Sequence, residues 1–260
     1  MAINRAQASN AFTSYVAAYD PTNPRIALKV AHTWRVAALA ERIAQAEALD
    51  ADLAWLCGLL HDVGRFEQVR RFDTFNDAAS VSHAALGAEV LFADGGAAPN
   101  TGAPLIRSFV ENDEADELIH TVVATHSDYR LPADLDERTR AYAHVLRDAD
   151  KIDIIKVNCI CPIEDIYGVS EASMRASALS PAVVSAFYEH RTIPRNIRVF
   201  PADILVSHIC FAWELVYPSS RALLAEQGYL DRMLSRRFGD PRTQQTFEAM
   251  ATHMRAKLPQ

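Results

Sequence analysis

The chain carries a series of histidine and aspartate residues whose types and order suit the binding of divalent metal ions. They are His32, the adjacent pair His61 and Asp62, then His83, His126 and Asp150. Imidazole nitrogens and carboxylate oxygens both coordinate hard-to-borderline divalent ions. Each member lies inside or at the end of a segment with helical character, and helices from distant parts of a chain can direct such side chains toward one point. The sequence therefore predicts a metal site built from several helices.

The helices that must position these residues are indicated by apolar residues at helical spacing. After a first helix over about residues 5–19 and a break at the Asp-Pro-Thr-Asn-Pro sequence, a long helix over about 25–49 is expected to contain His32. The next helix should begin after a cap at Asp50 or Asp52 and run to the His–Asp pair, with Gly64 as its C-terminal stop.

The remaining members of the series also fall in helical segments. The helices that should carry them span about residues 83–94, 114–125 and 137–157. Beyond Pro162, helical patterns continue over Ala182–His190, Ala202–Tyr217, Ser220–Gln227 and Tyr229–Phe238. A Gly-, Pro- and Ala-rich loop is expected over residues 95–104. Strand-like alternation is scarce, so the predicted fold class is all-α.

With these residues in view, the sequence resembles the HD-domain superfamily of metal-dependent phosphohydrolases, which is named after the adjacent His–Asp pair. The resemblance covers roughly residues 25–157 and rests on the order of ligand types, with a histidine about thirty positions upstream and an aspartate inside Arg-Asp-Ala-Asp-Lys-Ile-Asp downstream. It implies an HD-type helical bundle with a buried metal centre. We expect an N-terminal helix over 1–24, an HD core over 25–160, and additional C-terminal helices over 161–260 packed on that core.

The resemblance also implies how many metal ions are bound. The simplest HD phosphohydrolases would use the single-metal set that corresponds to His32, His61, Asp62 and Asp150. Here His83 and His126 supply two further nitrogens, as in the dinuclear variants of the superfamily. Two divalent ions bridged by Asp62, about 3.5–4 Å apart, would share an activated water for displacement at phosphorus. Manganese or iron is the expected metal, while magnesium, cobalt and nickel are also compatible.

Cationic side chains beside the ligand motifs are candidates for stabilising the phosphate in the transition state. Lys151 directly follows Asp150, and Arg65 lies three residues after Asp62. The resemblance implies that a basic residue just after the His–Asp pair contacts the substrate phosphate. The predicted catalytic residues are thus Asp62, Lys151 and Arg65. Asp153, one helical turn after Asp150, is a candidate for orienting a ligand histidine.

The leading functional prediction is hydrolysis of a phosphate mono- or diester of a small molecule, with nucleotides as a substrate class by resemblance. Cyclic dinucleotide phosphodiesterases of the superfamily carry a Gly-Tyr-Pro signature and a His–His pair, whereas Ser127 follows His126 here. The main alternative is a mixed-valent di-iron oxygenase with the same six ligands. Phosphonate-cleaving oxygenases of that kind place a Tyr and a Glu upstream of the first histidine; Tyr15 and Tyr19 precede His32 here, but no Glu does. A non-catalytic nucleotide-sensing module is the third alternative.

Composition adds bounds to these predictions. The chain has 260 residues, 50% of them hydrophobic, which suffices for one large domain or a domain with an appendage. A net charge of −7 gives no general attraction to nucleic acid. No apolar stretch is long enough to span a bilayer, and the N-terminus lacks the apolar core of a signal peptide, so we expect a cytoplasmic protein and no membrane partner.

The cysteines and the other histidines are expected to have ordinary roles. Four cysteines suit a reducing compartment, and Cys159 and Cys161 lack the second pair that a typical structural zinc site needs. Hydrogen-bonded core or surface roles are expected for His120, His144, His190, His208 and His253. The C-terminal part, which has no recognisable motif, is expected to complete the bundle or to form a homodimer surface.

Overall fold

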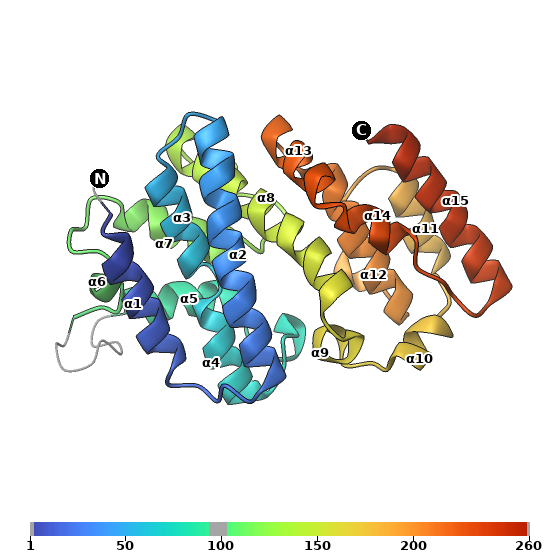
Figure 1. Ribbon diagram of the computed structural model, residues 1–260, viewed down its shortest axis with the longest axis horizontal. Helices are drawn as coiled ribbons and strands as arrows, with labels where there is room; N and C mark the ends of the chain where they lie inside the picture. The colour runs from blue at the N-terminus through green and yellow to red at the C-terminus, as the bar shows by residue number, and fades with distance from the viewer. Residues whose placement is uncertain (1–2, 94–102, 259–260) are drawn as a thin grey trace. The chain divides into compact units, whose positions relative to one another are not determined.

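The computed structural model describes residues 3–93 and 103–258, and within these ranges its regular elements are helices without a β-strand (Figure 1). This confirms the predicted all-α fold class. From the N-terminus through α8, the α-helices are α1 (Arg5–Val16), α2 (Pro24–Ala46), α3 (Ala51–Leu60), α4 (Val63–Phe72), α5 (His83–Phe92), α6 (Ile106–Phe109), α7 (Asp116–Thr125) and α8 (Glu137–Ile160). Those that follow are α9 (Ile163–Tyr167), α10 (Glu171–Arg175), α11 (Pro181–Tyr188), α12 (Pro201–Ile209), α13 (Pro218–Gln227), α14 (Tyr229–Leu234) and α15 (Pro241–Lys257).

The chain divides into two compact units, Met1–Asp150 and Lys151–Gln260. Helix α8 runs through the boundary, and Asp150 is the last residue of the N-terminal unit. The boundary thus falls ten residues before the predicted end of the HD core at residue 160. The predicted division into an N-terminal helix, an HD core and a C-terminal extension remains a proposal.

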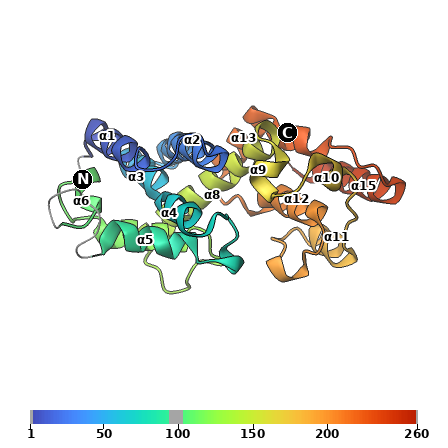
Figure 2. The ribbon, with the colours of Figure 1, turned by 90° about the horizontal axis from the view of Figure 1, so that it is seen from below.

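Close packing of helices in the N-terminal unit brings distant segments together. Helix α2 packs along α3, and α4 contacts both α2 and α5 (Figures 1 and 2). A Cβ atom at Gly58 of α3 would lie 2.6 Å from the Cα atom of Ala37, and one at Gly64 of α4 would lie 2.2 Å from the carbonyl oxygen of His83. Only glycine permits these approaches, which fix α3 on α2 and α4 on α5.

The ends of these helices follow from capping chemistry. The side chain of Asn23 accepts a hydrogen bond from the backbone N–H of Arg25 at the start of α2. Asp50 accepts from two backbone N–H groups at the start of α3, as predicted, and Ser82 accepts from the N–H of Ala85 at the start of α5. These side chains satisfy backbone donors that have no partner inside the helix.

One expectation about this unit is wrong. Gly64 does not terminate the preceding helix: α3 ends at Leu60, and Gly64 is the second residue of α4. Its role is the steric contact with α5, which no local signal in the sequence reveals. The predicted loop over residues 95–104 lies outside the described residues except for its last two positions. Among the helices that are described, none combines the length and apolar character needed to cross a membrane.

Candidate metal centre

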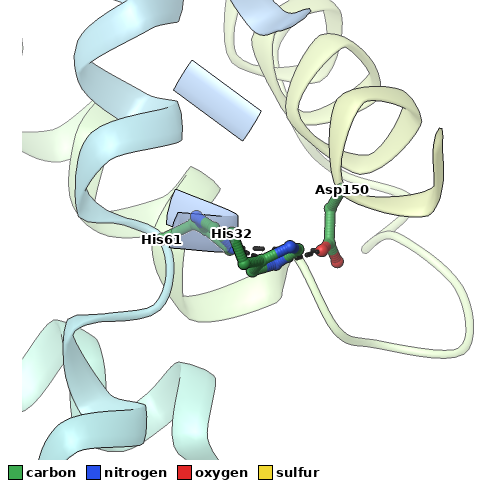
Figure 3. A group of neighbouring side chains, drawn as sticks. All are labelled: His32, His61 and Asp150. Atoms are coloured by element: carbon green, nitrogen blue, oxygen red, sulfur yellow. Dashed lines mark hydrogen bonds and ion pairs between the residues drawn. The ribbon is translucent and has the colours of Figure 1, made fainter. Parts of the chain in front are cut away.

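Three side chains from three helices of the N-terminal unit meet at one point (Figure 3). His32 comes from α2, His61 follows the last residue of α3, and Asp150 comes from α8. The Nε2 atom of His32 lies 3.3 Å from Nε2 of His61 and 3.1 Å from Oδ1 of Asp150. Such a convergence of two imidazoles and one carboxylate is a donor set that could hold a divalent ion.

A second cluster adjoins the first one. His61, Asp62 and His126 place their ligand atoms within 4.8 Å of one another, and all three are buried. Nε2 of His126, which follows α7, also lies 3.0 Å from Nε2 of His83, the first residue of α5. All six residues of the predicted ligand series are therefore brought together by the fold.

The carboxylate of Asp62 connects the two clusters through its two oxygen atoms. Oδ2 lies 3.3 Å from Nε2 of His61 and 3.5 Å from Nε2 of His32. The other oxygen, Oδ1, lies 3.5 Å from Nε2 of His83 and 3.9 Å from Nε2 of His126. Each oxygen of the carboxylate thus faces a different pair of imidazoles.

Hydrogen bonds on the far side of the imidazole rings show that the donor set fits metal ions. The Nδ1 atoms of His61 and His126 lie 2.7 Å from the carbonyl oxygens of Gly58 and Val123. A carbonyl oxygen only accepts, so each Nδ1 carries the hydrogen and each neutral ring keeps its lone pair on Nε2. Lone pairs that face one another at the centre repel unless a cation lies between them.

The electrostatics of the centre favour the protonation states that bind metal. Burial alone would raise the pKa of Asp62, but the charge of Lys29, together with the interaction with His61, holds it well below its usual range. Burial lowers the pKa of His83 to about 4, with the nearby Arg65 charge acting in the same direction, and burial also lowers the pKa of His126 to about 3. Neutral imidazoles beside ionised carboxylates are the forms that coordinate divalent ions.

Lys29 is a member of the site that the sequence analysis did not identify. Its Nζ atom lies 2.6 Å from Oδ2 of Asp62, and its side chain is only 14% exposed. Lys29 precedes His32 by three residues in α2, so both side chains project from the same helix face. That spacing was a signal in the sequence, but the approach to Asp62 depends on how α2 packs.

Asp77 is a second residue that the sequence analysis missed. Its Oδ2 atom lies 2.8 Å from Nδ1 of His83, and its Oδ1 atom accepts a hydrogen bond from Arg65 at 2.7 Å. Burial alone would raise the pKa of Asp77, but the hydrogen bond from His83 and the charge of Arg65 hold it below its usual range. An ionised Asp77 therefore fixes the His83 ring with Nε2 toward the centre, the usual role of a carboxylate behind a metal-binding histidine.

The predicted cations have different surroundings. Nε of Arg65 lies 3.7 Å from Oδ1 of Asp62, is buried, and has no hydrogen-bond partner among the described residues. Lys151 belongs to the C-terminal unit, where its Nζ atom lies 2.7 Å from Oε2 of Glu214. Asp153 is buried in the same unit. Arg65 thus stands at the centre with a free donor, while the roles of Lys151 and Asp153 stay predictions.

Comparison with known proteins agrees with this geometry. No curated protein and no solved structure shows a significant match to the chain. The family model of the HD domain matches residues 30–155, a range that includes all six residues of the ligand series. HD domains bind divalent metals, and most members of the family are metal-dependent phosphohydrolases. The predicted resemblance is therefore confirmed: residues 30–155 match the HD domain.

Proposed function

We propose that the protein hydrolyses a phosphate mono- or diester of a small molecule with the help of two divalent metal ions, and that nucleotides are the first substrate class to test. The observation that carries the proposal is the carboxylate of Asp62. Its two oxygen atoms face the His32–His61 pair and the His83–His126 pair, respectively. A single-metal site needs only the first of these pairs.

In this proposal the six residues divide between two ions. His32, His61 and Asp150 hold one, His83 and His126 mainly hold the other, and Asp62 bridges them. When bound, the ions acidify a shared water and neutralise the oxygens of the phosphoryl group. The four imidazoles favour manganese or iron over magnesium, which prefers oxygen ligands.

The chain's own cations supply the second part of the proposed chemistry. Lys29 and Arg65 lie on either side of the Asp62 carboxylate, and both approach the ring of Phe75, at 5.4 and 5.6 Å from its centroid. We assign both to the phosphate oxygens of the substrate, where positive charge stabilises the transition state most. Lys151 is proposed as a third contact to the substrate phosphate. Its ammonium group, which pairs with Glu214, would then have to leave that carboxylate and bind the substrate.

The surroundings of two tyrosines support hydrolysis over the oxygenase alternative. The hydroxyl of Tyr15 donates a hydrogen bond to the carbonyl oxygen of Val63, and the hydroxyl of Tyr19 lies 2.6 Å from a carboxylate oxygen of Glu67. Both side chains line a cavity of about 810 Å³, together with Glu67 and residues of α1 and α5. Both hydroxyls are therefore hydrogen-bonded to groups other than the six proposed ligands.

The test is hydrolysis of p-nitrophenyl phosphate, bis-p-nitrophenyl phosphate and a nucleotide panel by the manganese-loaded protein. The Asp62→Ala variant should lose activity, while Asp73→Ala, which changes a carboxylate with 82% side-chain exposure outside the site, should keep it. The preferred ester identifies a monoesterase or a diesterase. Activity that persists in Asp62→Ala would point to a contaminating reaction, and loss of activity in both variants would point to a general loss of structure.

A parallel measurement separates the alternatives. The iron-loaded protein is incubated with phosphonates and a reductant in an oxygen electrode. Oxygen consumption that depends on Asp62, together with no ester hydrolysis, would replace the hydrolase by the di-iron oxygenase. If nucleotides bind to the fully loaded protein without any turnover, the non-catalytic sensor is correct instead.

A further inference from the structure

Two histidines of the C-terminal unit face each other outside the HD centre. His190 follows the end of α11, and His253 lies in α15. Their Nε2 atoms are 2.6 Å apart, and the ring centroids are 5.0 Å apart. His190 is exposed and His253 is half-buried, and the contact between them lies at the protein surface.

This arrangement repeats a feature of the HD centre. There, the Nε2 atoms of His32 and His61 lie 3.3 Å apart, and those of His83 and His126 lie 3.0 Å apart. The contact between His190 and His253 belongs to the same type, Nε2 to Nε2, although the two residues are 63 positions apart in the sequence. In the HD centre, this type of contact accompanies a donor set suited to metal.

The backbone and the neighbouring rings hold the pair in place. His190 has a φ of 56°, in the left-handed region that residues other than glycine rarely adopt. Its ring stacks on Trp213, with centroids 4.2 Å apart and an interplanar angle of 21°. The ring of Tyr188 packs edge-on against His253 at 5.0 Å. These contacts restrict both imidazoles and so reduce the entropy that ion binding would otherwise cost.

One polar atom beside the pair lacks a partner. The indole N–H of Trp213 is buried, and no hydrogen-bond acceptor for it occurs among the described residues. Trp213 stacks directly on His190, so an acceptor held at the histidine pair, such as an ion-bound water or a small anion, could satisfy this donor.

We propose that His190 and His253 form a second metal site, which binds a borderline divalent transition ion of the zinc and copper class. Two neutral imidazoles favour such ions over magnesium or calcium, which need oxygen ligands. Within the described residues, the groups of three or more metal-ligand side chains lie in the HD centre. Water or an external ligand therefore completes the coordination here, and the site is open to exchange.

Trp213 provides a readout that the HD centre does not share. Because the indole stacks on a ligand histidine, Cu²⁺ bound at the pair should quench Trp213 fluorescence, whereas Trp34 and Trp55 belong to the N-terminal unit. The experiment titrates Cu²⁺ into tag-free protein. Because Cu²⁺ also displaces manganese from the imidazoles of the HD centre, the copper bound at the pair is taken as the difference between wild type and each Gln variant. The variants are His190→Gln, His253→Gln and Trp213→Phe, with His61→Ala as the matched variant of the HD centre.

The expected results separate the two sites. Each Gln variant should weaken the quenching titration by at least about tenfold, because one of two protein ligands is lost. Trp213→Phe should lose the quenching but keep the bound copper, measured by elemental analysis after dialysis. His61→Ala should keep the quenching. Equal titrations of wild type and both Gln variants would overturn the proposal, as would quenching that disappears only in His61→Ala.

A second measurement does not depend on the variants' folding. Diethyl pyrocarbonate modifies accessible imidazole nitrogens, and mass spectrometry locates the modified residues. Zn²⁺ should protect His190 and His253 in the wild-type protein but leave the modification of His144 unchanged. Equal modification of the pair with and without Zn²⁺ would show that the two nitrogens share only a hydrogen bond.

Discussion

At the scale of single residues, the metal centre depends on carboxylates that fix the direction of imidazoles. Asp77 illustrates this, because it holds His83 through Nδ1 and also accepts hydrogen bonds from Arg65 and Gln68. An ion bound by His83 is therefore sensitive to a residue that does not touch it. The same carboxylate keeps Arg65 beside Asp62, so it couples the ligand side of the centre to its proposed phosphate side.

Replacing Asp77 by Asn should weaken binding of the second ion. The loss of a carboxylate behind a ligand histidine typically reduces metal affinity by about 10–100-fold. We expect the manganese content after dialysis to fall from two ions toward one, as measured by elemental analysis. Asp73→Asn is the matched control, since Asp73 is exposed and pairs with Arg25. An unchanged ion content in Asp77→Asn would contradict the orienting role.

Lys29 supports a second prediction. Lys29→Met removes the ammonium group that lies 2.6 Å from Asp62, so kcat/KM for the phosphate ester should fall by roughly 100-fold. Ion content should stay the same or rise, because a competing positive charge is gone. Lys257→Met, at an exposed position of α15, serves as control. Tighter ion binding with unchanged kcat/KM would mean that Lys29 only neutralises Asp62.

The buried histidines predict how the metal-free protein responds to acid. A histidine in the unfolded chain titrates near pH 6.5, while the folded-state pKa values of His83 and His126 are about 4 and about 3 because of burial. Below pH 6.5 the unfolded state binds more protons, so the free energy of unfolding must fall as pH decreases. Asp62 and Asp150, whose pKa values are depressed, act only below pH 4.

The measurement is urea unfolding of the EDTA-treated protein between pH 7.5 and 4.5. Each of the two histidines should remove about 2 kcal/mol by pH 5, from 1.4 kcal/mol per pH unit. His126→Asn should show a distinctly shallower slope. A free energy of unfolding that stays constant from pH 7 to pH 5 would be incompatible with neutral buried histidines.

At the scale of helices, the site depends on how closely α4 approaches α5. A Cβ at Gly64 would also lie 2.5 Å from the backbone nitrogen of Gly87, so Gly64→Ala must push the two helices apart. His83 begins α5 and would move with it. We expect loss of the second ion and a destabilisation of about 1–3 kcal/mol, from overpacking. In Gly239→Ala the new Cβ would lie 3.5 Å from the nearest atom, so this control should be nearly neutral in both measurements.

The same contact shows what could be predicted from the sequence. The six ligand positions are recognisable because their residue types recur in a fixed order on helical segments, and local periodicity places those helices correctly. Gly64 was misinterpreted as a helix stop, because its role is a contact with α5 that depends on tertiary packing. Lys29 was missed for the same reason, because its partner Asp62 lies 33 positions along the chain. Asp77 lies only six positions before His83, but it reaches that ring from the segment between α4 and α5, whose fold no local periodicity indicates.

The C-terminal unit shows a different limit. Helix α15 was not predicted, although its buried Phe247, Met250 and Met254 follow a helical period. The many polar residues of α15 weaken the helical pattern of its apolar residues. The packing of the helix against its neighbours, which stabilises it, cannot be read from composition. The expected helix over Ala202–Tyr217 is in fact α12 followed by a 3-10 helix at Cys210–Glu214. Because α15 was missed, the contact of His253 with His190 could not be anticipated.

At the scale of the whole molecule, the boundary between the two compact units falls within helix α8. The family match spans residues 30–155. The six proposed metal ligands, and the cations Lys29 and Arg65, all lie in the unit that ends at Asp150. Ions at the HD centre bind only the folded form of that unit and must stabilise it; at a free ion concentration 100 times the Kd, each site contributes about 2.7 kcal/mol.

This predicts a local response to metal removal. Hydrogen exchange of the manganese-loaded protein should speed up after EDTA treatment in α2, α3, α5 and α7, while α11 and α15 should not change. Manganese is the suitable ion, because it is the weakest in the order of imidazole affinity and leaves a two-histidine site empty. The Asp62→Ala variant should show no EDTA response in α3. A uniform change across both units would mean that the chain unfolds as one cooperative body, and that the HD centre stabilises all of it.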